Sequence, residues 1–384
     1  MAFQTQAYTV YEAGRPIRLE QVFIDDVKEG EVLVETVAFS VCATDAKAAA
    51  GKFLLKPPMI LGHEASGIVL HAPPTSNLKP GSKVILTYSS CGTCPTCSSH
   101  ASPYCHDLSA LNFSGRRKDG SSAIKDSSGN ELNHFFFGQS SMGRHVLAQE
   151  TSIVKLPDDT SIEDLRKFAS LGCGIQTGAG AIVNVCSPPP SSTIAILGAG
   201  SVGLSAALAA LTSSPKRIIL IDNDSRKFSL VPTALQASER IVHIDSSKLP
   251  APSDGIAPLT TAIKDATSGI GADFVLDCVG LPSLIEASIP ALARKGTMIT
   301  VGGGAPGVEA KVRLMDMLIG GRSWRGTHQG DSVPGEFLPR LIGMWKEGKF
   351  GFDELLTMYG FEDLERAMED VKKGKTVKAV LAVK

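Results

Sequence analysis

The sequence predicts an α/β protein with a doubly wound parallel sheet that follows a β-rich region. From residue 181 to about 319, short apolar runs alternate with stretches of helical composition, the pattern of parallel strands joined by helices. Before residue 180, short apolar or alternating runs are separated by Gly and Pro, which is typical of irregular β structure. The proline-rich stretch 187–192 (SPPPSS) marks the change between the two regions.

The β-rich region contains three clear strand candidates and one long polar segment. The strand candidates are 31–39 (EVLVETVAF), 67–70 (GIVL) and 83–88 (KVILTY). Residues 109–133 are polar and rich in Gly and Ser, so we expect a surface loop there.

The second region predicts a regular alternation of strands and helices. We expect strands at 193–197, 217–222, 240–245, 272–280 and 296–304. We expect helices at 201–214, 259–268 and 284–294, and one more between 222 and 240. After residue 320 we expect helices at 337–348 and 361–375, followed by a strand at 378–383.

The composition of the chain indicates its class and its surroundings. The 384 residues suffice for two domains, and the hydrophobic content of 43% is ordinary for a globular protein. A net charge of -1 gives no electrostatic reason to expect nucleic acid or an anionic membrane as partner. With no long apolar run and no readable secretion signal, we expect a cytoplasmic protein whose thiols stay reduced.

A glycine-rich turn predicts a dinucleotide site. Gly198, Gly200 and Gly203 spell G-x-G-x-x-G after an apolar run and at the start of a helical stretch. The turn lets the backbone approach a pyrophosphate at the helix N-terminus. Asp222 ends the next apolar run, where a carboxylate binds ribose hydroxyls and repels a 2′-phosphate, and Asp224 adds to that repulsion. We therefore expect NAD rather than NADP; the alternative is a glycine turn that binds nothing.

Four closely spaced cysteines predict a structural metal site. The spacing is C-x2-C-x2-C-x7-C, in a segment rich in turn residues. Four thiolates can close a tetrahedral zinc site without an open position, and the alternative disulfide cluster requires an oxidising compartment. The cysteines are Cys91, Cys94, Cys97 and Cys105.

Three further groups are scattered along the chain: Cys42, His63 and Cys173. Two thiolates and one imidazole with a vacant position are typical of a catalytic zinc site. Spacing does not show that the three meet, and each alone is more simply explained as a core or turn residue. Cys186 and Cys278 have no ligand-like neighbours, so we expect them in the core.

Together these motifs resemble the zinc-dependent medium-chain alcohol dehydrogenases, particularly the longer aryl (benzyl-type) members. The resemblance implies a GroES-like catalytic domain at 1–180, completed by 320–384, and a Rossmann NAD-binding domain at 181–319. The matching stretches are SVCATD (40–45), GHEASGIV (62–69), CGTCPTC (91–97), NHFFFGQSSMGRHV (133–146), LGCGIQTGAGA (171–181), LGAGSVG (197–203), IDNDSRKF (221–228), GRSWRGTHQGDSVP (321–334) and KGKTVKAVLAV (373–383).

The resemblance implies a role for residues around two zinc ions per chain. The catalytic zinc would be bound by Cys42, His63 and Cys173, and the structural zinc by the four clustered cysteines. Thr44 would hydrogen-bond the substrate oxygen, Asp45 would orient His63, and Glu64 would lie behind the zinc.

The resemblance also implies the coenzyme contacts. Thr177 and the Val202 amide would touch NAD, Lys227 would lie near the adenosine ribose, and Lys378 would meet the pyrophosphate. Ala43 stands where many relatives have a basic phosphate-binding residue.

Two positions concern the proton and the substrate. Lys47 stands where several relatives end the proton relay with His, so either Lys47 or water would end it here. Thr87 stands where an aromatic residue narrows the pocket in some relatives, which leaves room for a bulky substrate, and Phe136 would line the same pocket.

The resemblance implies reversible hydride transfer between a primary, aryl or bulky alcohol, or its aldehyde, and NAD(H). The alternatives are a carbonyl reductase of a specialised metabolite, glutathione-linked formaldehyde oxidation and a relative that binds NAD without catalysis. A zinc-ribbon nucleic-acid module would need a basic patch that the cysteine segment lacks. The long segment 109–138 resembles dimeric members, so we expect a homodimer paired near 296–303 and the segment after it.

Overall fold

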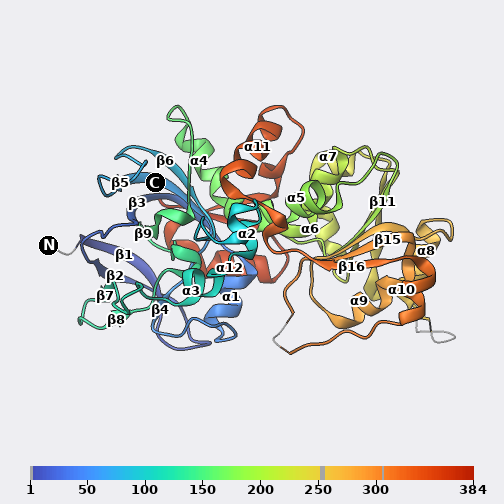
Figure 1. Cartoon of the computed structure of the whole chain (residues 1–384), viewed down its shortest axis with the longest axis horizontal. Coiled ribbons are helices and arrows are strands. Elements are labelled where there is room, and N and C mark those ends of the chain that lie inside the picture. The colour runs from blue at the N-terminus through green and yellow to red at the C-terminus, as the bar shows by residue number, and fades with distance from the viewer. Residues whose placement is uncertain (1–2, 251–255, 305–306) are drawn as a thin grey trace. The chain divides into compact units, whose positions relative to one another are not determined.

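The computed structural model describes residues 3–250, 256–304 and 307–384 (Figure 1). Contacts divide the chain into two compact units. Unit 1 comprises Met1–Cys173, Val333–Pro339 and Leu356–Lys384, and unit 2 comprises Gly174–Ser332 and Arg340–Leu355. The domain boundaries expected at 180 and 319 stay a prediction.

Unit 1 contains a five-stranded antiparallel sheet in the order β4-β1-β2-β7-β8. Ala7, Val22, Ile124 and Leu132 lie in one buried cluster on this sheet. The strands are β1 (Phe3–Val10), β2 (Arg18–Ile24), β4 (Met59–Ile60), β7 (Ile124–Asp126) and β8 (Glu131–Leu132).

The second sheet of unit 1 has seven strands and includes a strand from the far end of the sequence. Its order is β10-β6-β5-β3-β18-β17, and β9 also pairs with β3. β18 pairs antiparallel with β3 and parallel with β17. The strands are β3 (Glu31–Ser40), β5 (Ala65–His71), β6 (Lys83–Leu86), β9 (His145–Gln149), β10 (Ile153–Lys155), β17 (Leu356–Gly360) and β18 (Lys378–Ala382).

Short helices surround these two sheets. The α-helices are α1 (Ala43–Ala49), α2 (Pro95–Ser98), α3 (Leu108–Phe113), α4 (Ile162–Phe168) and α12 (Leu364–Lys372). α4 begins at the Ser161 cap, whose side chain accepts a hydrogen bond from the Asp164 N–H.

The expectation of a surface loop at 109–133 is wrong in part. The segment contains most of α3 and the hairpin β7–β8. Ala123, Ile124 and Leu132 are buried in the five-stranded sheet's core. Polar residues, many of them Gly and Ser, form the turns between these short elements. They dominate the composition of the segment, so its composition predicts a loop.

Unit 2 contains a six-stranded parallel sheet in the order β13-β12-β11-β14-β15-β16, which confirms the predicted doubly wound sheet. The central strand β11 is buried at every position, as expected for a strand covered on both faces. The strands are β11 (Thr193–Leu197), β12 (Arg217–Asp222), β13 (Ile241–Asp245), β14 (Ala272–Asp277), β15 (Leu292–Thr300) and β16 (Ser323–Gly326).

Helices pack on this parallel sheet, and Figure 1 shows α9 and α10 beside β15. The helix expected between 222 and 240 is only a 3-10 turn at Ser225–Leu230 and the short α7, because Pro232 separates them. The α-helices are α5 (Gly174–Gly180), α6 (Ser201–Leu211), α7 (Thr233–Gln236), α8 (Pro258–Ala266), α9 (Pro282–Ser288) and α10 (Leu314–Gly320), while α11 (Pro334–Lys346) contributes residues to both units.

Among the described residues, no single helix has both the length and the apolar composition to cross a membrane. In the part of the chain that the structure describes, one pair of helical segments, 162–172 and 174–186, passes such a test together, and the two are bent by 65° relative to each other.

Candidate active site

Four side chains that could bind a metal ion, from distant parts of the unit 1 sequence, lie in one cluster. Ligand atoms of Cys42, His63, Glu64 and Cys173 all lie within 4.8 Å of one another. Cys42 is the cap residue of α1, His63 and Glu64 lie between β4 and β5, and Cys173 follows a 3-10 turn at Ala169–Gly172. The three groups that the sequence left scattered are therefore brought together.

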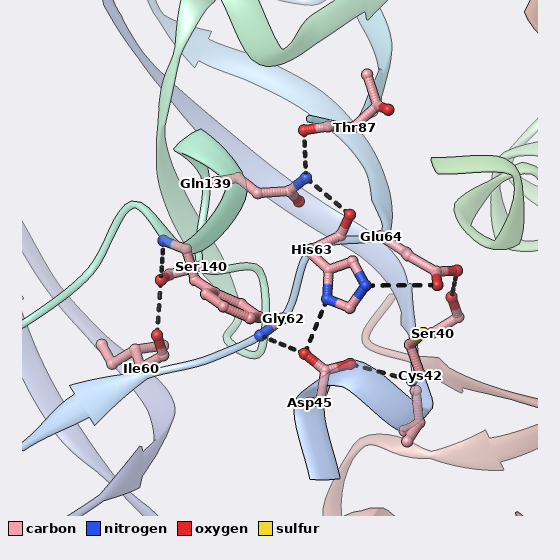
Figure 2. Close-up of polar contacts among 12 residues, drawn as sticks. Ser40, Cys42, Asp45, Ile60, Gly62, His63, Glu64, Thr87, Gln139 and Ser140 are labelled. Carbon is pink, nitrogen blue, oxygen red and sulfur yellow. Dashed lines mark hydrogen bonds and ion pairs between the residues drawn. The ribbon is translucent and has the colours of Figure 1, made fainter. Parts of the chain in front are cut away.

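Asp45 orients two of these residues, His63 and Cys42 (Figure 2). Its Oδ1 lies 2.9 Å from His63 Nδ1 and accepts a bond of 3.2 Å from the Gly62 N–H. Its Oδ2 accepts a bond of 3.0 Å from the Cys42 N–H. The carboxylate is fully buried, so these contacts fix both the tautomer and the direction of the imidazole.

The backbone before His63 requires glycine. Gly62 has φ +94°, and a Cβ there would lie 2.5 Å from the Met142 nitrogen. A larger residue would displace the segment that carries His63.

The geometry of His63 and Cys42 fits a metal ion. His63 Nε2 is buried, makes no hydrogen bond among the described residues and lies 3.8 Å from Glu64 Oε1. The Cys173 thiol donates a hydrogen bond to Cys42, which together with the charge of Lys378 outweighs burial and holds the pKa of Cys42 well below its ordinary value. A thiolate and a neutral imidazole nitrogen that makes no hydrogen bond are the forms that bind zinc.

Glu64 is held in the cluster by a buried ion pair. Lys378 Nζ lies 2.6 Å from Glu64 Oε2, and the Ser40 hydroxyl donates a bond of 2.6 Å to the same carboxylate. Burial lowers the pKa of Lys378, but Glu64 and Cys42 outweigh burial, so the pKa of Lys378 is raised. Lys378 is only 1% exposed, and its expected contact with a pyrophosphate stays a prediction.

The other residues expected near the substrate lie on α1. Thr44 is half-buried in the first turn of the helix, whereas Ala43 and Lys47 are exposed. Their roles in substrate binding and proton transfer stay predictions.

The four clustered cysteines form a second candidate metal site. Their sulfur atoms also lie within 4.8 Å of one another, and none of the eight cysteines, all of them described, forms a disulfide. Backbone N–H groups of Cys94 and His106 donate to the sulfurs of Cys91 and Cys94 over 3.3 and 3.5 Å. The Thr96 hydroxyl and the His106 N–H help to lower the pKa of Cys94 to about 5, which favours the metal-binding thiolate.

The glycine-rich turn of unit 2 joins β11 to α6. A Cβ at Gly203 would lie 1.9 Å from the Gly198 carbonyl oxygen, so only glycine permits this close packing of helix and strand. Gly200 caps α6 and leaves the first N–H groups of the helix available to an anion.

Asp222 lies at the carboxyl end of β12 beside this turn. Its Oδ2 accepts a bond of 2.7 Å from the Ala199 N–H, and Lys227 Nζ lies 3.0 Å from the same oxygen. Asp222, Lys227 and the glycine turn are therefore one connected group, as a dinucleotide site requires.

Thr177 and Val202 lie on two helices that pack together. Thr177 belongs to α5 and Val202 to the first turn of α6. The Ser205 hydroxyl of α6 donates a bond of 2.6 Å to the Ile175 carbonyl of α5. Thr177 itself lies 3.1 Å from Gln329 Oε1. Contact of either residue with a coenzyme stays a prediction.

Gln139 and Ser40 belong to the site, although no sequence pattern pointed to them as site residues. The Gln139 amide donates to the His63 carbonyl, and Ser40 donates to Glu64. Gln139 lies inside a matched stretch of sequence, but only the fold shows that it contacts His63.

Comparisons with known proteins agree with this geometry. Residues 28–158 match the family described as "Alcohol dehydrogenase GroES-like domain", and residues 201–344 match "Zinc-binding dehydrogenase". A geraniol dehydrogenase from Castellaniella defragrans is 37% identical over 378 residues, which cover 98% of this chain and 97% of that protein.

Two solved structures are similar over the whole chain. An alcohol dehydrogenase zinc-binding domain protein from Burkholderia ambifaria has a TM-score of 0.91 and 35% identity, and covers 100% of this chain with 99% of its own. The benzyl alcohol dehydrogenase from Acinetobacter calcoaceticus has a TM-score of 0.90 and 32% identity, with both chains covered completely.

The chain belongs to the zinc-containing medium-chain alcohol dehydrogenase family. It is a zinc-dependent alcohol dehydrogenase, an oxidoreductase with a GroES-like sheet and a Rossmann-like sheet, and two candidate metal sites. The fold class and the family resemblance are confirmed.

Proposed function

We propose that this enzyme oxidises bulky primary alcohols of the aryl or terpenoid type with NAD, and reduces the corresponding aldehydes with NADH. The observation that carries this proposal is the meeting of Cys42, His63 and Cys173 beside a group of phenylalanine rings.

We assign the residue roles as follows. Cys42, His63 and Cys173 would hold a zinc ion, which would supply the Lewis-acid chemistry that lowers the pKa of an alcohol hydroxyl group. The Thr44 hydroxyl would accept the substrate proton and would pass it toward the ribose and solvent, where Lys47 or water would end the relay. Lys378 neutralises Glu64, so that no unpaired carboxylate lies beside the ligands.

The aromatic group supports a bulky, planar substrate. Phe53 lies 5.2 Å from Phe113 and 5.5 Å from Phe136, and Phe136 lies 5.5 Å from the His63 ring, measured between centroids. Phe53 and Phe113 are half-buried, so their rings retain surface for a ligand. Similarity to a benzyl alcohol dehydrogenase and a geraniol dehydrogenase supports the same substrate class.

We infer that unit 2 binds NAD in preference to NADP. The Asp222 carboxylate would bind the ribose hydroxyls of NAD and repel a 2′-phosphate. The glycine turn at 198–203 would receive the pyrophosphate at the N-terminus of α6.

A substrate panel tests the proposal. Benzyl alcohol, geraniol and ethanol would each be oxidised with NAD and with NADP, the aldehydes would be reduced with NADH, and zinc would be measured by mass spectrometry. We expect two zinc ions per chain, the highest kcat/KM for benzyl alcohol or geraniol, and preference for NAD. Equal rates with ethanol would contradict the substrate class, and preference for NADP would contradict the role of Asp222.

We also propose a cytoplasmic homodimer that forms through α10 and β16, in the segment after 296–303, because β15 itself is paired with β14 and β16 and offers no free edge. β16 is an edge strand with every residue exposed, and edge strands invite pairing with another chain. Next to it, α10 exposes Leu314 (82%), Leu318 (74%) and Ile319 (63%). Light scattering should give twice the chain mass, and Leu318→Glu should give the chain mass; an unchanged mass would contradict this interface.

A further inference from the structure

The segment Phe135–Ser140 has an unusual backbone. Phe135, Phe137 and Ser140 have φ values of 59°, 55° and 58°, in the left-handed region that residues other than glycine rarely adopt. Such conformations persist only where the surroundings hold them, and they concentrate at functional sites. The segment lies against His63, because Phe137 stacks on the His63 ring and Gln139 donates to the His63 carbonyl.

Gln139 joins two separate parts of the backbone (Figure 2). Its Nε2 donates a bond of 2.9 Å to the His63 carbonyl and one of 2.7 Å to the Thr87 carbonyl. The side chain is only 1% exposed, so no solvent competes for these two bonds.

Thr87 continues the connection toward Cys173. Its hydroxyl donates a bond of 2.6 Å to the carbonyl of Gly172, the residue immediately before Cys173. Thr87 is itself 1% exposed, just beyond the end of β6. Hydrogen bonds therefore run from His63 through Gln139 and Thr87 to the peptide that precedes Cys173.

We propose that Gln139 and Thr87 are positioning residues that set the spacing between His63 and Cys173 for the catalytic zinc ion. This inference rests on the proposed role of the same site. Neither residue belongs to the candidate ligand group, and both act through backbone carbonyls.

The two sets of contacts complement each other. Asp45 connects His63 with Cys42, and the Gln139–Thr87 bridge connects His63 with Cys173. His63 is common to both, so the three ligand residues form one hydrogen-bonded frame. Outer contacts of this kind govern how tightly a metal is held.

The same strained segment also holds the face of the imidazole. Phe137 stacks on His63 with the ring centroids 4.6 Å apart and the planes 26° apart. The left-handed conformation at Phe137 thus places the Phe137 ring on the imidazole. It also directs the side chain of Gln139, two residues further on, toward the His63 carbonyl.

Zinc release tests the proposal. The variants are Gln139→Leu, which removes both donors, and Thr87→Val, which removes only the hydroxyl. The transfer of zinc to a coloured chelator would be followed over time under native conditions. The variant Cys42→Ser, which should keep only the structural site, identifies the kinetic phase in which the structural zinc is released. We expect the catalytic zinc to leave each variant on the order of 10-fold faster than wild type, with the structural phase unchanged.

Two controls separate positioning from general damage. Thr87→Ser restores the hydroxyl and should restore slow release. Ser140→Ala removes buried hydrogen bonds from the same segment, to Ile60 and Phe136, without contact to a ligand residue. It should lower the melting temperature and leave zinc release unchanged.

Wild-type release rates in both Gln139→Leu and Thr87→Val would overturn the proposal, as would equal acceleration in Ser140→Ala. If Gln139→Leu does not fold, the Thr87→Val and Thr87→Ser pair decides alone. If Cys42→Ser instead retains two zinc ions, the proposed function fails; if it retains one and the bridge variants release zinc normally, only this inference fails.

Discussion

The two candidate metal centres are built in opposite ways. The four-cysteine centre lies within residues 91–105, and only Cys105 among its ligands is buried. Its sulfurs accept hydrogen bonds from the backbone N–H groups of Cys91, Cys94 and His106. The second centre draws its ligands from three separate stretches, and buried side chains, chiefly Asp45, fix them.

The geometry of the four-cysteine centre depends on local sequence, whereas that of the second centre depends on the tertiary fold. The four-cysteine site follows from local spacing and needs little beyond its own loop. The second site exists only when the sheets of unit 1 have brought α1, the β4–β5 connection and the turn before Cys173 together. We therefore expect damage at the first site to affect stability, and damage at the second to affect chemistry.

The largest effect should come from Cys173→Ser. Without one thiolate the catalytic zinc is lost, so kcat/KM should fall roughly 1,000-fold or more. Zinc should drop from two ions to one per chain, and binding of NADH, measured by fluorescence, should be nearly unchanged. Normal activity in this variant would contradict the assignment of the chemistry to the second centre.

Cys94→Ser should act on stability instead. Loss of the metal that closes the 91–105 loop should lower the free energy of unfolding in urea by more than about 3 kcal/mol. The zinc that remains should support a normal kcat per catalytic site. A stable variant with low kcat would show that this loop contributes to the chemistry.

Asp45→Asn should have a smaller effect on the second centre. The amide is a poorer acceptor for His63 Nδ1, so zinc affinity and kcat/KM should fall about 10- to 100-fold. Asp126→Asn is a matched control, because Asp126 is also buried and accepts bonds from Ser128 and Asn130, away from the cluster. Equal zinc loss in both variants would contradict a specific role for Asp45.

The smallest effect concerns His134, a buried histidine outside both candidate metal groups. Burial lowers the pKa of His134 to about 3, so the unfolded chain, with a histidine pKa of about 6.5, takes up the proton first as the pH falls. Stability is therefore lost below pH 6.5, by about 1.4 kcal/mol between pH 7.5 and 5.5. Between these two pH values, the free energy of unfolding of His134→Phe, measured by urea denaturation, should fall by about 1.4 kcal/mol less than that of wild type. An identical fall in both proteins would contradict the lowered pKa of His134.

Much of the molecule could be predicted because its signals are local. The cysteine spacing at 91–105 and the glycine turn at 198–203 each carry their chemistry within one short stretch. Cys42, His63 and Cys173 have no such spacing, and only the family resemblance joined them. The ion pair between Glu64 and Lys378 escaped prediction because it depends on the pairing of β18 with β3.

The position of β18 determines the order in which the polypeptide becomes able to fold during synthesis. β18 lies between β3 and β17, yet the ribosome makes it after every residue of unit 2. The Rossmann-like unit can therefore be assembled while the catalytic sheet still lacks an inner strand and Glu64 lacks its lysine. Until residue 382 emerges, the nascent chain has all three candidate zinc ligands but an incomplete sheet to hold them.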